Sequence, residues 1–436
     1  MSGKGACLIA LQGGISRANL SSWFKRLVAS DFIRKVGETF ATRIFLIGIG
    51  LVTTVIVTRT LGPEGRGFYA VAMAVGAIGV QFGNLGLHAS NTYHVARNPE
   101  LLPKLVGNSL MVSFLLGGCG SLVTWVVFYI WPQLAPVKGW LLILSLAWVP
   151  FGLAYMLLQN LLLGIHEIRA YNKVEVLNKL VTVVLIVVVL AMRYVTVELV
   201  FSAGFLAVIY SFVWVLWRLS PHMKQAPYPS FSLFTENLRY GLRAYAAAFF
   251  AFLVLRIDLL MVKHLLGSAQ AGYYSVAVNM ADMVSMLAVV CGTIIFPKLS
   301  AMECVQEKLK FTVNTALLIG VVMVVTSLAA ALLAKPLILM LFGKTFLPML
   351  NAFLLLLPAI VLLSVNVVFM NFFAAIGMPL VTVYSPGIAS FVNIGLNALL
   401  IPQYGIEGAS ISSIFAYGLM LIFSIHHMHA VKVNGV

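Results

Sequence analysis

Long apolar runs separated by short polar segments fill the chain from about residue 40 to residue 430. An α-helix needs about 20 apolar residues to cross the hydrocarbon core of a bilayer. Runs of this length predict six spans in the first half of the chain: 40–60, 68–88, 105–130, 139–163, 174–192 and 197–218. Six more are predicted in the second half: 240–264, 271–296, 311–334, 347–375, 380–401 and 408–430. The pattern therefore predicts an all-α integral membrane protein of about 12 transmembrane helices.

The polar segments divide these spans into two groups. The expected units are a cytoplasmic or interfacial N-terminal segment, an N-terminal six-helix bundle, a cytoplasmic linker, a C-terminal six-helix bundle and a cytoplasmic tail, at 1–39, 40–218, 219–239, 240–430 and 431–436. Within the first segment, Leu20, Trp23 and Phe24 fall on one helical face. This spacing fits either an interfacial amphipathic helix or a solvated basic lead-in to the first span.

Composition agrees with a chain that faces lipid. Hydrophobic residues make up 61% of it and charged residues 9%, whereas soluble domains have about 25% charged residues. The net charge of +15 would suggest a nucleic-acid partner in a soluble protein. Here the basic residues lie mostly in short loops, so no nucleic-acid partner is expected. More than twice as many Lys and Arg residues fall on the side of the N-terminus as on the other, which predicts that both termini are cytoplasmic.

An internal repeat gives the two groups of spans a common origin. Residues 61–72 read LGPEGRGFYAVA and residues 266–277 read LGSAQAGYYSVA, with half of the positions identical. The glycines permit a tight turn, and Tyr69, Tyr273 and Tyr274 are expected to be anchors at the membrane interface. Six spans per half is an even number, so both halves start on the same side of the membrane. The repeats are then parallel, related by an axis along the membrane normal, with a central lumen between the bundles.

Three stretches resemble a known family: RTLGPEGRGFY at 59–69, NLGLHASNTYHVARNP at 84–99 and LIPQYGIEGAS at 400–410. They look like polysaccharide-export flippases of the O-antigen type, within the MATE-like multidrug/oligosaccharidyl-lipid/polysaccharide superfamily. The resemblance covers about 40–430. It implies alternating access in a bacterial inner membrane and flipping of an undecaprenyl-pyrophosphate-linked oligosaccharide to the outer leaflet. The implied partners are this anionic lipid-linked oligosaccharide, membrane lipid and other polysaccharide-assembly membrane proteins.

Polar residues inside spans are candidate site residues by default, because they are costly to keep in a bilayer. The substrate-binding candidates are Arg43, Lys179, Arg243, Arg256 and Asn279, and the ion-coupling candidates are Asp258 and Asp282. When the two repeat copies are aligned, four candidates of the second half fall on apolar or uncharged residues of the first half. Arg256 aligns with Leu51, Asn279 with Ala74, Asp258 with Thr53 and Asp282 with Ala77, so these four are departures from the repeat. Arg256 is expected either to bind phosphate or to pair with Asp282. Each acid has a structural alternative as an ion pair or a hydrogen bond between helices.

Several function classes are disfavoured. The chain has no Walker motif, GxSxG, HExxH or paired catalytic carboxylates, so no catalytic residue, metal or cofactor is expected. Energy would come from an ion gradient or from downstream consumption of the glycan. A cation-coupled multidrug exporter of the same fold is the main alternative, but four intramembrane bases against two clear acids favour an anionic cargo. A membrane glycan polymerase or ligase is the alternative from another class, although the external connections are short and poor in acids.

Overall fold

The computed structural model describes the chain from residue 31 to residue 434, with side chains from 41 to 432 apart from 240, 243, 293 and 294. The amphipathic stretch around Leu20 lies outside the described residues. The first half consists of α3 (Asp31–Asn84), α4 (Leu87–Arg97), η1 (Pro99–Leu101), α5 (Leu102–Met111), η2 (Val112–Leu116), α6 (Gly117–Ile130), η3 (Pro132–Leu134), α7 (Gly139–Gly164), α8 (Ile168–Ala191), α9 (Val197–Leu219) and η4 (Ser220–His222). The second half consists of α10 (Phe231–Leu266), α11 (Ser268–Ala301), α12 (Val305–Leu341), η5 (Lys344–Met349), α13 (Leu350–Ala375), α14 (Val381–Tyr404) and α15 (Ile406–Asn434).

Apolar helices long enough to cross a membrane dominate this architecture. Among the described residues, 11 helices meet this requirement, and the first of them covers Ala41–Asn84 with 44 residues. A straight helix of that length would be about 66 Å long, twice what the hydrocarbon core requires. It is broken at Gly62, which has φ 66° and ψ −176° and precedes Pro63. The two parts of α3 are thus the first two of twelve spans, and the predicted multi-pass all-α fold is confirmed.

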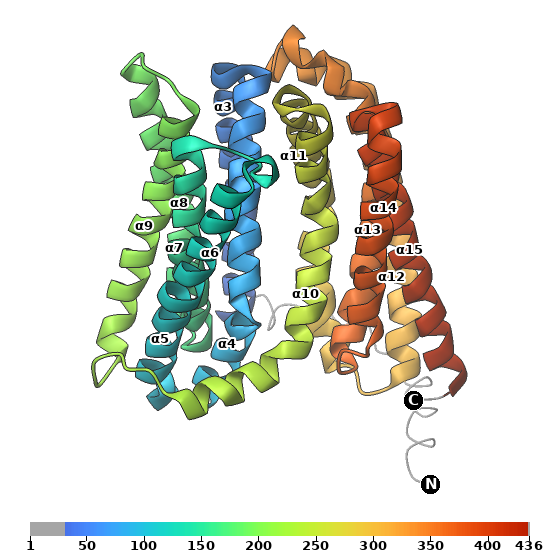
Figure 1. The fold of residues 1–436 in the computed structure, drawn as a ribbon. Coiled ribbons are helices and arrows are strands. Elements are labelled where there is room, and N and C mark those ends of the chain that lie inside the picture. The colour runs from blue at the N-terminus through green and yellow to red at the C-terminus, as the bar shows by residue number, and fades with distance from the viewer. Residues whose placement is uncertain (1–30, 435–436) are drawn as a thin grey trace.

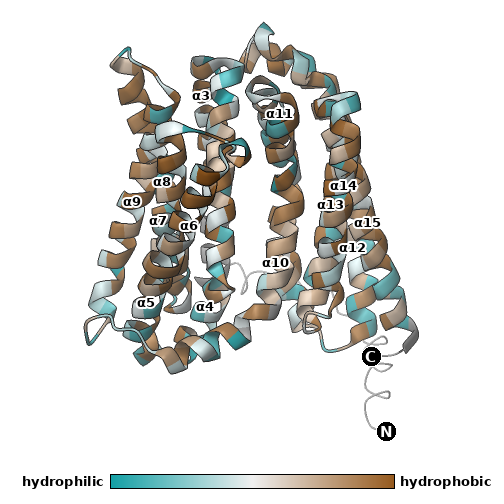
Figure 2. Ribbon diagram, in the orientation of Figure 1, coloured by the Kyte–Doolittle hydropathy of each residue, from teal (hydrophilic) through white to brown (hydrophobic). Residues whose placement is uncertain are grey.

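The helices form two bundles, α3–α9 and α10–α15 (Figure 1). We call the end of the molecule where α3 begins and α15 ends the proximal end, and the opposite end, which carries Gly62 and η5, the distal end. Hydrophilic residues concentrate at these two ends, with a hydrophobic band between them (Figure 2). The first part of α10 runs along the proximal end before the helix turns into its span (Figure 1). Because α10 begins at Phe231, it includes the last part of the segment expected to be the linker 219–239.

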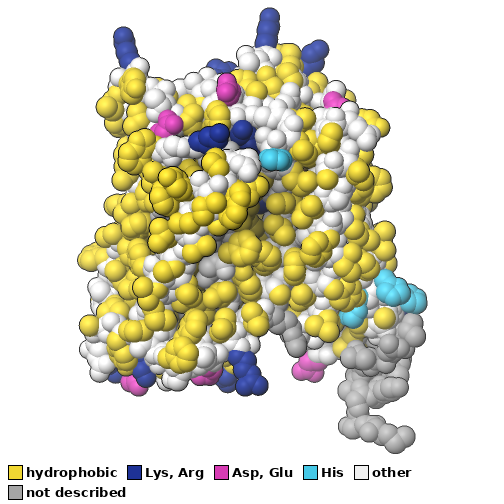
Figure 3. Space-filling view, in the orientation of Figure 1, with side chains coloured by type: hydrophobic (Ala, Val, Ile, Leu, Met, Phe, Trp, Pro, Cys, Tyr) yellow, Lys and Arg dark blue, Asp and Glu magenta, His cyan; other side chains and the backbone are white. Residues whose placement is uncertain are grey.

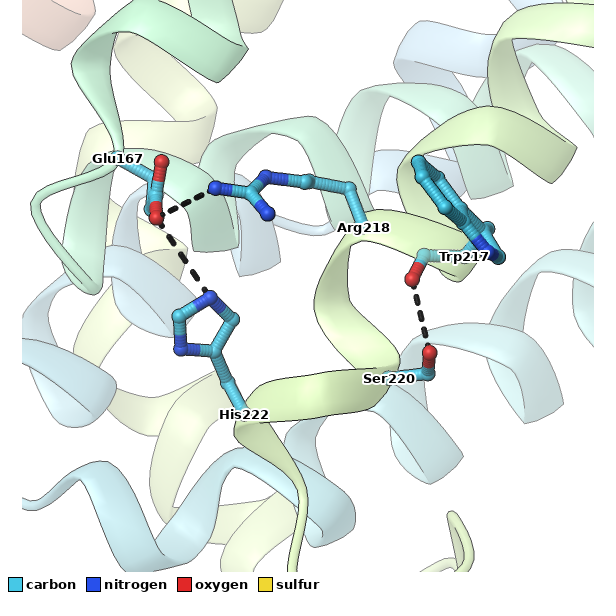
Figure 4. Close-up of polar contacts among 5 residues, drawn as sticks. All are labelled: Glu167, Trp217, Arg218, Ser220 and His222. Atoms are coloured by element: carbon cyan, nitrogen blue, oxygen red, sulfur yellow. Dashed lines mark hydrogen bonds and ion pairs between the residues drawn. The ribbon is translucent and has the colours of Figure 1, made fainter.

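Polar contacts around Glu167 fasten the first bundle at its proximal end. Arg218, in the last turn of α9, donates to Glu167 at 2.8 Å. His222 of η4 points to the same carboxylate, with its Nε2 3.6 Å from Oε1 (Figure 4). Glu167 precedes α8, so these contacts hold the turn between α7 and α8 against the end of α9. They fix the last span of the first bundle just before the chain crosses to the second.

The repeat motif is the point where the two bundles meet at the distal end. A Cβ atom on Gly67 would lie 1.8 Å from the carbonyl oxygen of Ser268, and one on Gly272 would lie 1.9 Å from that of Pro63. Gly67 and Gly272 occupy the same position of the repeat, as do Pro63 and Ser268. The contact is therefore the same on both sides of a pseudo-two-fold axis, as in an interface between two like subunits. We call it the distal seam.

A second close crossing lies at the proximal end, between the start of α4 and the first part of α10. A Cβ on Gly86 would lie 2.4 Å from the carbonyl oxygen of Gly241, and one on Gly241 would lie 2.7 Å from that of Gly86. Nearby, Asn237 donates to Asn91 at 3.2 Å. This proximal seam joins residues that are not repeat partners, so it is not duplicated by the symmetry that produces the distal seam.

We expect the alanine variants Gly67→Ala and Gly272→Ala to destabilise the protein by about 1–3 kcal/mol each, because overpacking against backbone cannot be relieved by a rotamer change. Thermal unfolding of the purified protein in detergent measures the effect. Gly48→Ala is the matched control, since a Cβ at that helical position meets nothing within 4 Å. Equal melting temperatures for all three variants would show that the distal seam is not closely packed.

Candidate functional site

A polar cavity of about 460 Å³ lies between the two bundles. Both parts of α3 line it, together with α7, α8 and α9 from the first bundle and α10 and α11 from the second. Small residues on the second part of α3 (Ala70, Ala74 and Ala77) recur at helical spacing and give that wall a smooth face toward the cavity. We call this space the central cavity.

Three basic side chains from different helices line the central cavity: Arg66 on α3, Lys179 on α8 and Arg256 on α10. Arg66 is only 5% exposed, and its Nε atom has no hydrogen-bond partner among the described residues. The Arg66 guanidinium lies 5.4 Å from the centre of the Tyr69 ring, a contact that holds it in place without neutralising it. A buried guanidinium without a carboxylate partner is costly, so this geometry favours a bound anion.

Arg256 links the two helices that the second bundle contributes to the cavity. Its guanidinium lies 3.3 Å from an oxygen of Asp282 on α11. The two side chains are 39% and 41% exposed. An anion that reaches Arg256 and forms a bidentate contact would compete with Asp282 for the guanidinium. Of the two alternatives that the sequence left open for Arg256, pairing with Asp282 is the one observed in this structure.

Asp258 is the acid that lines the cavity most directly, but its oxygens are already occupied. It is 3% exposed. One oxygen accepts a hydrogen bond from the hydroxyl of Tyr274, and the other accepts from the backbone N–H of Leu259 at 2.8 Å. These two bonds satisfy the carboxylate within its own bundle. Among the described residues, Arg66 and Lys179 are then the cavity charges for which no ion pair is seen.

The structure separates the sequence candidates into two groups. Four of them line the central cavity, and a fifth joins it through an ion pair: Lys179, Arg256, Asp258 and Asn279 line it, and Asp282 is the fifth. Arg43 instead pairs with Glu175 of α8 at 3.0 Å and is not among the residues that line the cavity. The side chain of Arg243 lies outside the described part of the structure.

Sequence reasoning missed two charged residues. Arg66 was counted in a loop between spans, whereas α3 carries it into the cavity. Arg66 aligns with Ala271 when the two repeat copies are compared. The same comparison that indicated Arg256 would therefore have indicated Arg66 too. Glu175 was not recognised as an intramembrane acid, although it lies within a predicted span and pairs with Arg43.

The expectation that the repeat tyrosines are interface anchors was wrong for two of them. Tyr69 and Tyr274 are buried, at 9% and 0% exposure. Tyr69 lies beside Arg66 and lines the cavity, and Tyr274 bonds Asp258. The two tyrosines occupy equivalent positions in the repeat, so each bundle uses its copy to hold a charged residue. Tyr273 packs edge-on against Phe346 of η5 at the distal end.

The chain matches a known protein family over more than half of its length. Residues 32–303 match the family described as "Polysaccharide biosynthesis protein". The chain belongs to this family. A membrane protein of Methanocaldococcus jannaschii, itself uncharacterized, is 30% identical over 162 residues, which cover 36% of this chain and 32% of that relative. The match thus spans about a third of the length of the relative.

Solved structures with the same fold are membrane transporters. The inward-facing conformation of a multidrug resistance MATE family transporter of the MOP superfamily superposes with a TM-score of 0.73 at 15% identity, covering 89% of this chain and 96% of the transporter. The lipid II flippase MurJ in an inward closed conformation gives a TM-score of 0.67 at 13% identity, covering 90% of this chain and 87% of the flippase. The outward-facing conformation of a MATE family transporter gives 0.63 at 16% identity, covering 93% and 98%.

The chain is thus a multi-pass membrane protein of the polysaccharide biosynthesis protein family. Its two six-helix bundles around a central cavity have the fold of these solved structures.

Proposed function

We propose that the protein flips an undecaprenyl-pyrophosphate-linked oligosaccharide, a precursor of a polysaccharide or O-antigen, from the inner to the outer leaflet by alternating access. The observation that supports this proposal best is Arg66, a buried guanidinium in the central cavity without an acidic partner among the described residues. Such a group gains most from a ligand that brings negative charge and several acceptor oxygens, and a pyrophosphate does both.

The distribution of charge supports an anionic cargo over a cationic one. Arg66 and Lys179 project from the first bundle and Arg256 from the second, so a pyrophosphate can contact both bundles at once. A cationic drug would need free carboxylates. Asp258 is the acid that lines the cavity among the described residues, and it already accepts two hydrogen bonds. The multidrug exporter is therefore the weaker candidate, although a transporter of that class has the same fold.

The cavity chemistry also suits the sugar part of the cargo. Amide side chains of Asn178 and Asn279 line the space beside the basic groups. Amides can both donate to and accept from sugar hydroxyls. A polar glycan can then leave water without losing its hydrogen bonds, which would otherwise be very costly in hydrocarbon. The apolar carrier can stay in the bilayer.

The proposal also covers the orientation of the protein in the membrane, the units of the chain and the partners. We place the proximal end, with both termini, on the cytoplasmic side of a bacterial inner membrane, because that side carries the excess of Lys and Arg. The units are the N-terminal segment 1–39, bundles 40–218 and 240–430 joined by linker 219–239, and the tail 431–436. The distal seam then closes the outer side in the state observed. The partners are the anionic lipid-linked oligosaccharide, membrane lipid and other polysaccharide-assembly membrane proteins.

We expect Arg66→Gln and Arg256→Gln to slow the flipping of a fluorescent polyprenyl-pyrophosphate oligosaccharide in proteoliposomes by about tenfold or more, the effect of losing one charged hydrogen bond. Arg66→Lys should retain more activity than Arg66→Gln, because it keeps the charge. Arg193→Gln, which changes an exposed arginine in the turn after α8, is the control. Wild-type rates in both cavity variants, with normal membrane insertion, would refute the assignment of the cargo site.

We assign ion coupling to Asp282, because release of Arg256 to the cargo frees this carboxylate to take up a proton. Asp282→Asn should abolish the dependence of the flipping rate on an imposed pH gradient, while flipping without a gradient continues. Glu198→Gln, at an exposed acid in the first turn of α9, should respond to the gradient like the unaltered protein. If Asp282→Asn still responds fully, the carboxylate serves only to pair with Arg256.

A further inference from the structure

A second, larger cavity lies outside the central one, on the side of the molecule that faces the viewer in Figure 3. It has a volume of about 1090 Å³ and is lined mainly by α3, α6, α7 and α10 and by the turn around η3, together with Leu116 of η2 and Ala398 of α14. Pockets for drug-sized ligands have volumes of about 300–1,000 Å³, so this space is large enough for a longer molecule. We call it the lateral groove.

The lateral groove is separated from the central cavity by α3. Val75, Ile78, Gly79 and Phe82 face the groove, whereas Ala70, Met73, Ala74 and Ala77 face the central cavity. Both sets follow helical spacing, so they occupy two different faces of one helix. The α10 helix passes between the two spaces in a similar way, from Asp258 and Leu259 on the central side to Leu260 and Met261 in the groove.

The groove is apolar along its length and basic at one end. From Val75 to Leu85 it follows α3 for about 15 Å. Lys263 and His264, in the last turn of α10, line it at the distal end. The Lys263 ammonium lies 5.2 Å from the centre of the Phe68 ring, which holds it over the repeat motif. In Figure 3, basic side chains and a histidine gather at the distal part of this face, above a recess lined by hydrophobic side chains.

We propose that the lateral groove binds a polyprenyl phosphate lipid, with its hydrocarbon tail along α3 and α6 and its phosphate at Lys263 and His264. The charge arrangement carries this assignment, since an apolar channel with a basic group only at its distal end matches an anionic headgroup on a long tail. The turn at 133–136 borders the same space. This site deepens the proposed function and rests on it, because it keeps the carrier tail beside the cavity that moves the glycan.

Two glycines of α6 provide a matched pair of variants. A Cβ on Gly120 or on Gly118 meets nothing within 4 Å, so a side chain can start at either position without a clash at its first atom. Gly120 lines the lateral groove, whereas Gly118 lies on another face of the same helix. Gly120→Leu therefore fills the groove, and Gly118→Leu changes the same helix by the same side chain elsewhere.

The test is retention of added C55 polyprenyl phosphate by the purified full chain, measured by native mass spectrometry. Gly120→Leu and Lys263→Gln should each weaken retention by about tenfold, and Gly118→Leu should leave it unchanged. The neutral polyprenol should be retained about tenfold less than the phosphate by the unaltered protein. Inorganic phosphate at millimolar concentration should not displace the lipid, because it lacks the tail.

Other outcomes overturn the proposal. Equal retention by Gly120→Leu and Gly118→Leu would exclude the groove, and equal retention of phosphatidylglycerol and polyprenyl phosphate would assign it to ordinary bilayer lipid. Flipping assays keep the two proposals distinguishable. If the unaltered chain retains the lipid but does not flip the glycan, the proposed function fails and the groove stands. If Gly120→Leu flips at the wild-type rate and retains the lipid, the groove fails and the function stands.

Discussion

The close approach of Gly67 and Gly272 to the opposite backbone is the contact on which the rest of the structure depends. Only a residue without a Cβ allows a carbonyl oxygen to lie where these two glycines meet Ser268 and Pro63. The contact joins two copies of one motif, so it defines the axis that relates the bundles and holds them together at the distal end. The central cavity lies between the bundles, on the proximal side of this contact.

The candidate functional residues lie at positions where the two repeat copies differ. The repeat supplies similar helices and similar turns, and it places Tyr69 and Tyr274 at equivalent sites. The residues beside these tyrosines differ: the first half has Arg66, and the second has Asp258. One bundle thus presents an unpaired cation, and the other satisfies its acid internally. This asymmetry leaves the cavity lining with more basic than acidic side chains, which is the basis of the proposed anionic cargo.

Hydropathy and the repeat were enough to predict the fold. Twelve apolar runs became twelve spans, because a bilayer allows little else for segments of that length. Hydropathy alone failed for Arg66, which sits only four residues after the Gly62 break. A hydropathy window treats such a residue as part of a loop, whereas the distal seam draws the turn inward and buries it, and only the repeat comparison could have indicated it. The pairing of Arg43 with Glu175 could not be predicted from the sequence, since it depends on which faces of α3 and α8 meet.

The lateral groove needed the packed bundles before it could be recognised. Its lining comes from helices of both bundles and from a turn, which are distant in sequence, and no motif in the chain marks it. The same is true of the proximal seam, in which Gly86 and Gly241 are not repeat partners. Periodicity predicts which faces of a helix are apolar, but packing decides which of those faces remain open.

The most direct test of the account is a comparison of two cargoes in proteoliposomes that contain only the unaltered protein. One is a fluorescent polyprenyl-pyrophosphate oligosaccharide and the other is a lipophilic cationic dye. The account predicts that the anionic lipid crosses at least about tenfold faster than in protein-free vesicles, and that the dye crosses at the protein-free rate. Transport of the dye without movement of the lipid would contradict the assignment of the central cavity to an anionic cargo.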